Sequence, residues 1–143
     1  MKLVRKINII SLIFIFFLLA SCSGTGTKTV PNISSSNSEA GNTSLYFVRE
    51  GGYVAGGVLA KLNVNGNEIA KLGTKEYIKH SVNNNFRIKV SGAGLGGLGM
   101  GGDSVSGIAN GNNYFYIIGV KQGLFSASFT INETTESGYK QNQ

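Results

Sequence analysis

The sequence has very few of the residues that cross-link, interrupt or functionalise a fold. Cys22 is its only cysteine, Pro31 its only proline and His80 its only histidine, and tryptophan is absent. A lone cysteine excludes an intramolecular disulfide, so any folded part must be stabilised by its hydrophobic core. Because the proline lies close to the N-terminus, the later segments can form strands without interruption.

Groups for catalysis or metal binding are scarce as well. Asp103 is the only aspartate beside the lone His80, whereas catalytic triads and zinc sites need several such groups to converge. We therefore predict no enzyme, no metal site and no bound cofactor, and we expect His80 on the surface or at the edge of a strand. A hydrolase that combines a serine with Asp103 and His80 is the alternative that the composition leaves open.

The N-terminus has the pattern of an export signal. A short basic segment precedes a run of twelve residues, 9–20, that is apolar except for Ser11. A helix that spans a bilayer needs about 20 apolar residues, whereas the apolar region of a signal peptide has about 7–15. The pattern therefore predicts a signal peptide over residues 1–21.

This run ends in a motif around the only cysteine. Residues 19–22 read Leu-Ala-Ser-Cys and resemble the lipobox of bacterial lipoproteins, in which cleavage precedes a cysteine that carries acyl groups. The resemblance implies two or three chains on Cys22 and stable membrane attachment, since one chain alone binds only marginally. An ordinary signal peptide is the alternative. Ser23 stands where an aspartate usually marks inner-membrane retention, which favours the outer membrane of a Gram-negative host.

The mature chain is only weakly basic. Removing residues 1–21 leaves ten Lys and Arg against seven Asp and Glu, a charge of about +3. It has no basic run, so the electrostatic footprint of a nucleic-acid binder is missing. Residues 22–43 are rich in Ser, Thr, Gly and Asn, a composition that predicts a lipidated, flexible tether. We expect one folded domain over residues 44–135 and a polar tail over residues 136–143.

Apolar and polar residues alternate with period two in several short segments, and no helical periodicity is evident. Segments 45–49, 86–90 and 125–131 each have one apolar face, and 114–120 is apolar on both faces, as in a central strand. Turn residues separate the segments about every ten positions, which is typical of sandwiches and barrels. We predict an all-β fold: a single antiparallel β-sandwich, immunoglobulin-like or transthyretin-like, on a disordered N-terminal tether.

The clearest turn is a hairpin at Asn65-Gly66. A type I′ turn needs positive φ at both central positions, and Asn-Gly is the pair that adopts it most readily. A two-residue turn there would pair Leu62 with Ile69 on one face of the sheet.

A second segment, 92–102, consists of seven glycines with Ala93, Leu95, Leu98 and Met100. It contains a G-x-G-x-x-G pattern, but the residues after it cannot hold the helix that dinucleotide binding needs, so we predict no nucleotide. Glycine loses much backbone entropy on ordering, which predicts a mobile loop at one end of the sandwich. Leu95, Leu98 and Met100 would then contact a partner or the membrane surface; a tolerated low-complexity insertion is the alternative.

The order of these features resembles a small domain of bacterial lipoproteins, domain of unknown function family 2846. An aromatic strand that ends in arginine (45–50) precedes a "V-x-V-N-G-x-x-I-G-x-L"-like hairpin (62–72) and a short aromatic strand (77–78). A strand that leaves a turn (86–90) and an "x-G-x-x-Y-x-Y" central strand (110–116) follow. The family usually has a Pro-Gly-Lys/Arg-His turn before the third apolar strand, where this chain has three asparagines.

The resemblance implies a sandwich akin to PEGA or transthyretin-like modules and supplies no catalytic residues. We therefore expect a non-catalytic structural or interaction module, held in the cell envelope by Cys22, with an envelope protein as a possible partner. Binding of a glycan through tyrosine-rich faces and loops is the alternative, and an envelope hydrolase is a third.

Overall fold

The computed structural model describes residues 24–33, 42–52 and 55–142, and strands dominate them. The predicted signal peptide and its cysteine, Cys22, lie outside the described residues. The strands are β1 (Thr43–Arg49), β2 (Leu59–Val64), β3 (Asn67–Leu72), β4 (Tyr77–Val82), β5 (Phe86–Ala93), β6 (Asp103–Gly107), β7 (Asn113–Gln122) and β8 (Ala127–Thr134). A 3₁₀ turn, η1 (Leu95–Gly97), and one short helix, α2 (Glu136–Gln141), complete the described part. No helix among these residues is long and apolar enough to cross a bilayer.

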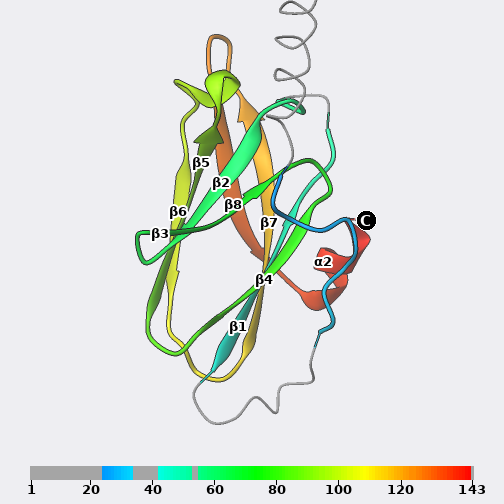
Figure 1. Ribbon diagram of the computed structural model, residues 1–143, viewed down its shortest axis with the longest axis vertical. Coiled ribbons are helices and arrows are strands. Elements are labelled where there is room, and N and C mark those ends of the chain that lie inside the picture. Colours follow the sequence, from blue (N-terminus) through cyan, green and yellow to red (C-terminus); the bar gives the residue numbers. More distant parts are fainter. Residues whose placement is uncertain (1–23, 34–41, 53–54, 143) are drawn as a thin grey trace, which may run out of the picture.

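The strands form two four-stranded sheets that pack face to face (Figure 1). The β1 sheet has the order β4-β1-β7-β8, and the β2 sheet has the order β3-β2-β5-β6. All neighbouring strands are antiparallel except β1 and β7, which are parallel. The predicted all-β sandwich is therefore confirmed, with one parallel pair that the purely antiparallel prediction missed. A parallel pair needs a long connection, and five strands separate β1 from β7.

The main core lies between the two sheets. Alternation predicted its members correctly in β1, β5 and β8, where Phe47, Ile88 and Phe129 are each at most 1% exposed. Phe125, which the same alternation assigned to the last strand, is instead completely exposed, because β8 begins at Ala127. The buried residues of this core are Leu45, Phe47, Ala60, Leu62, Val64, Ala70, Leu72, Val82, Phe86, Ile88, Val90, Tyr116, Ile118, Phe129 and Ile131.

The Asn-Gly hairpin forms between β2 and β3, with φ of 52° at Asn65 and 84° at Gly66. Its register differs from the prediction: Leu62 pairs with Ala70 rather than with Ile69, because a bulge interrupts the ladder after Leu62. A one-residue shift exchanges the two faces of a strand. Here the shift points the side chain of Ala70 into the core, where it is buried.

The outer face of the β1 sheet is covered by a second, smaller core. Tyr46, Val48, Tyr77 and Phe115 project from the sheet, and Tyr139 of α2 lies against them. The ring of Tyr139 is 5.5 Å from those of Tyr77 and Phe115 and 6.0 Å from that of Tyr46. With apolar contacts on both sides, all seven residues of β1 are buried.

Within the predicted polar tail, residues 136–141 form the helix α2. Thr135 caps this helix by accepting a hydrogen bond from the Gly138 N–H over 3.2 Å, as threonine often does at a helix start. The helix places Tyr139 in full burial, whereas its other side chains reach solvent. A single buried aromatic in six residues gives no detectable periodicity in the sequence.

The predicted flexible tether also differs from the structure, over residues 24–33, which we call the strap. Val30 and Ile33, the bulky residues that interrupt its polar composition, pack against the second core. The strap runs across the outside of the β1 sheet beside α2 (Figure 1). Its few apolar side chains find a preformed apolar surface, so composition alone underestimated its order.

Candidate functional site

One end of the sandwich carries large apolar side chains in solvent. The η1 segment and the β7–β8 loop lie side by side there, at the top of Figure 1. Leu95 and Leu98 are 90% and 77% exposed, and Leu124 and Phe125 are 94% and 100% exposed. We call these four residues the apolar end. Met100, predicted to accompany the two η1-segment leucines, instead packs partly buried on the main core.

Close backbone packing holds the glycine-rich segment 92–102, in contrast to the predicted mobile loop. Gly101 bridges to β8, and its N–H donates a hydrogen bond to the Ala127 carbonyl over 3.1 Å. A Cβ added to Gly92 would lie 2.8 Å from the Cα of Gly97, so larger residues could not adopt this path. The contacts offset the entropy that glycine loses on ordering.

The β7–β8 hairpin extends beyond the rest of its sheet. The β1–β7 pairing ends at Arg49 and Ile118, whereas the β7–β8 pairing continues to Gln122 and Ala127. At a rise of about 3.3 Å per residue, the four additional residues of β7 extend by roughly 13 Å. Leu124 and Phe125 lie at the tip of this extension.

The strap is attached to the sandwich by backbone pairing near the same end. Thr27 and Tyr77 exchange two backbone hydrogen bonds of 2.9 and 2.8 Å, and the Thr25 N–H donates to the Lys71 carbonyl over 2.7 Å. Lys28 adds a hydrogen bond to the Thr74 carbonyl. The first described residues of the chain are thus joined to the end of β3 and the start of β4.

Glu76 links the strap to the β3–β4 turn. Its carboxylate accepts a hydrogen bond from the Gly73 N–H over 2.8 Å and lies 3.7 Å from the Lys28 ammonium. Glu76 is 9% exposed, so this ion pair is partly screened from solvent. Gly24 packs directly against the same carboxylate, where a side chain would collide with it.

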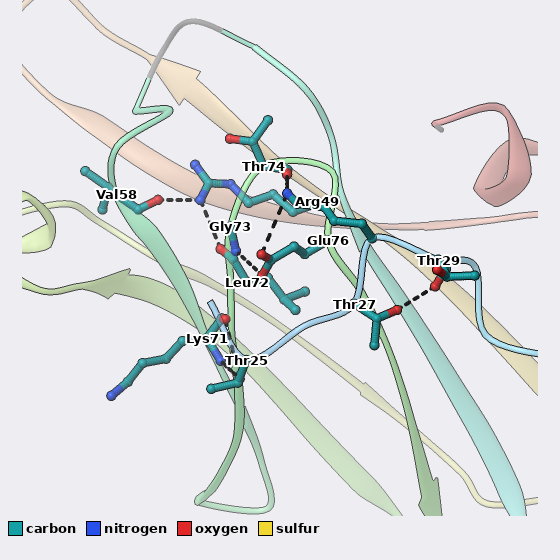
Figure 2. Close-up of polar contacts among 11 residues, drawn as sticks. Thr25, Thr27, Thr29, Arg49, Val58, Lys71, Leu72, Gly73, Thr74 and Glu76 are labelled. Carbon is teal, nitrogen blue, oxygen red and sulfur yellow. Dashed lines mark hydrogen bonds and ion pairs between the residues drawn. The ribbon is translucent and has the colours of Figure 1, made fainter. Parts of the chain in front are cut away.

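Arg49 organises the loop on the other side of this turn. It is 2% exposed, and its guanidinium donates to the carbonyls of Val58, Leu72 (3.0 Å) and Ala55 (2.7 Å), as Figure 2 shows for the first two. Burial lowers the pKa of Arg49, and the negative charge of Glu76 opposes that shift. A buried cation that donates to three backbone carbonyls has a structural role, because it holds these segments together. The sequence indicated only that this arginine ends an aromatic strand.

The outer face of the β2 sheet is polar and basic. Across it Lys61 pairs with Lys71, and Asn63 pairs with Lys89. Arg87 and Lys89 line a groove of about 680 Å³ in which Asp103 is the one acidic residue. The groove is lined by Asn63, Asn65, Gly66, Arg87, Lys89, Gly102, Asp103 and Ser104. Because cations outnumber the carboxylate, this face is suited to an anionic ligand.

The residues of the hydrolase alternative are far apart. His80 lies on β4, at one edge of the β1 sheet, and Asp103 begins β6, at an edge of the β2 sheet. These two strands lie over opposite edges of the sandwich, since β4 contacts β3 and β6 contacts β8. Burial lowers the pKa of His80, which is half-buried at an edge rather than on the open surface.

The structure also shows where the G-x-G-x-x-G pattern and the tyrosines lie. The G-x-G-x-x-G pattern forms η1 and then leads into β6, where dinucleotide binding would need a helix. Among the described tyrosines, Tyr46, Tyr77, Tyr116 and Tyr139 are buried, and Tyr114 is partly buried. The tyrosine-rich faces therefore serve packing and do not form a platform for a sugar ring.

The chain matches no protein-family model, no curated protein and no solved structure at a significant level. The resemblance to domain of unknown function family 2846 therefore stays a prediction.

Proposed function

We propose that this chain is a lipid-anchored lipoprotein of the bacterial cell envelope, in which the sandwich is a non-catalytic interaction module related to domain of unknown function family 2846. The lipobox-like residues 19–22 supply the anchor, and Ser23, which stands where an aspartate would signal inner-membrane retention, favours the outer membrane of a Gram-negative host. An envelope protein is the expected partner. No residue of the sandwich is assigned a catalytic role.

The observation that carries this proposal is the strap. In the mature chain Gly24 would be the third residue, and it packs on the β3–β4 turn through Glu76. An acyl group on Cys22 would then be only two residues from the folded domain. Such a short connection would hold the module close to the membrane in a defined orientation, which suits a part that presents a surface to a partner.

Acylation is tested by the Cys22→Ala variant of the full chain in its bacterial host. The variant should lose labelling by a fatty-acid probe and leave the membrane fraction, because the thiol is the site of attachment. Ser21→Ala keeps a small residue before the cysteine and serves as the control, with labelling unchanged. Membrane partition that survives in Cys22→Ala would rule out the anchor.

A second candidate function is binding of an anionic glycan, favoured by the basic groove on the β2 sheet. Arg87 and Lys89 project from β5, and both are exposed. Arg87→Ala combined with Lys89→Ala should weaken retention on an acidic polysaccharide, and added salt should weaken it for the unsubstituted chain too. Equal retention of the two chains would exclude this groove as the binding site.

A further inference from the structure

We propose that the apolar end inserts into the surface of the bilayer that holds the acyl chains. This inference rests on the proposed lipid anchor and adds to it a second contact with the membrane. Leu95 and Leu98 of the η1 segment, together with Leu124 and Phe125 of the β7–β8 loop, form that contact. The sandwich then stands on the membrane with its strands directed away from it.

The distribution of exposed apolar side chains supports a specific surface. Among the described residues, the large hydrophobic side chains with high exposure are the four of the apolar end and Ile108. Ile108 belongs to the β6–β7 connection, at the opposite end of the strands. Exposed apolar residues that gather at one place indicate an interaction site, whereas an isolated one needs no explanation.

Backbone hydrogen bonds also order the two loops of the apolar end. The Gly123 N–H donates to the Ser126 carbonyl over 2.7 Å and closes the turn that carries Leu124 and Phe125. The Leu98 N–H donates to the Leu95 carbonyl over 3.3 Å in the neighbouring turn. Since backbone bonds order both loops, little entropy is lost when their side chains enter an apolar phase.

The position of the strap indicates that the apolar end contacts a membrane. Gly24 lies against the β3–β4 turn, level with the end of β1, because Glu76 accepts a backbone hydrogen bond from Arg49 over 3.0 Å. Cys22 lies two positions before Gly24, and an extended chain spans at most about 7 Å over that length. The acylated cysteine must therefore lie near the end of the sandwich that carries the apolar side chains.

The heights of anchor and tip agree with insertion. The β7–β8 hairpin extends roughly 13 Å beyond the end of β1 at the rise of a strand, whereas Cys22 reaches at most about 7 Å beyond the strap. With the cysteine at the headgroups, the tip would lie at least about 6 Å deeper, which matches the roughly 5–10 Å that apolar faces of interfacial elements penetrate.

Because the chain has no tryptophan, one introduced tryptophan reports its own surroundings. The acylated full chain with Phe125→Trp is reconstituted in vesicles of phosphatidylethanolamine and phosphatidylglycerol, with or without lipid brominated near the glycerol end of its acyl chains. Asn84→Trp, in the exposed turn between β4 and β5 at the far end, is the matched control. Both positions are exposed, so neither substitution should disturb the fold.

The tryptophan at position 125 should emit at shorter wavelength and lose about half of its fluorescence to the brominated lipid, as expected for a side chain at the headgroup and acyl boundary. The tryptophan at position 84 should emit as in water and keep its intensity. Emission as in water from both positions would overturn the inference. A shift at position 125 without quenching by the brominated lipid would also overturn it, because the tip would then contact protein, such as a second copy.

The mass of the same preparation shows separately whether Cys22 is acylated. An acylated chain whose position 125 is not quenched overturns this inference and leaves the proposed function standing. A chain without acyl groups overturns the proposed function and this inference together.

Discussion

The outer faces of the two sheets differ in what covers them. The outer face of the β1 sheet presents Tyr46 and Phe115 and is covered by α2 and the strap, whereas that of the β2 sheet presents Lys61, Arg87 and Lys89 and stays open. Both sheets contribute their inner faces to the main core. The difference shows that half of this sandwich has a third layer, made from segments outside the strands.

Because of this difference, the covered face contributes to stability and the open face is available for binding. Apolar side chains on the covered face contribute stability, because burial removes them from water. The open face lacks that contribution and carries adjacent cations, Lys61 beside Lys71, of which Lys71 forms an exposed ion pair with Glu68 over 3.4 Å. A face of this kind is available for an anionic ligand, and substitutions on the two faces should separate stability from binding.

The largest effect is expected from Tyr46→Ala on the covered face. Tyr46 is fully buried and stacks on Phe115 with ring centroids 5.0 Å apart. Its truncation should destabilise the domain by about 3–5 kcal/mol, as for other buried aromatic residues, measured by urea denaturation. Lys89→Ala on the open face is the control and should stay within about 0.5 kcal/mol of the original chain. Similar losses in both variants would remove the distinction between the faces.

A smaller effect is expected when the strap loses its apolar contacts. Val30→Ser combined with Ile33→Ser removes two partly buried side chains from the second core and should cost roughly 1–3 kcal/mol. Asn32→Ser, at the exposed position between them, should be silent. Proteolysis between the strap and β1 should accelerate in the double variant alone. A double variant as stable as the original chain would show that the strap does not add to the fold.

Tyr139→Phe should change the pH dependence of stability more than stability itself. Burial raises the pKa of Tyr139 above its usual value of 10, with smaller contributions from Tyr77 and Tyr46. The unfolded chain therefore releases this proton first, so stability is complete below about pH 10 and falls as the pH rises further.

The hydroxyl of Tyr139 has no hydrogen-bond partner among the described residues. Its removal should leave stability at neutral pH within about 1 kcal/mol of the original chain, or raise it. As the pH is raised from neutral to alkaline, the denaturation midpoint of Tyr139→Phe should begin to decrease at a higher pH than that of the original chain. An unchanged alkaline profile would mean that the phenol does not titrate differently in the folded protein.

The smallest effect is expected on the open face, from Lys61→Glu. Lys61 lies directly opposite Lys71 in the β2–β3 ladder. Like charges in that position destabilise a sheet, and the ion pair of Lys71 with Glu68 over 3.4 Å offsets part of this repulsion. Reversing one charge should stabilise the domain by about 0.2–1 kcal/mol, and added salt should reduce the gain. Thermal denaturation at two salt concentrations measures both quantities, and a loss of stability in low salt would contradict the expectation.

The sequence by itself determined the local structure of the domain. Period-two alternation in 86–90 placed Phe86, Ile88 and Val90 in the core, because successive side chains of a strand point to opposite faces. Asn65-Gly66 determined a hairpin, since few residue pairs adopt positive φ twice. Both signals depend on neighbours along the chain, and the all-β sandwich followed from their repetition.

These local signals could not predict the strand register, the strand ends or the parallel pair. The bulge after Leu62 and the start of β8 at Ala127 depend on which partner strand lies alongside. Phe125 continues an alternating pattern, yet it lies in a turn because the β7–β8 pairing ends two residues later, at Ala127. The pairing, and not the pattern, decides where a strand begins.

Only the tertiary structure decided which of the remaining residues matter. Tyr139 and Ile33 stand in polar segments. Tyr139 becomes buried and Ile33 partly buried because the β1 sheet presents an apolar outer face to them. Leu95 and Phe125 are 30 residues apart in the sequence, and they share one end because Gly101 pairs with Ser128. Contacts between distant segments leave no period in a sequence. The third layer, and the addition of Leu124 and Phe125 to the predicted Leu95 and Leu98, could therefore be found only in the folded chain.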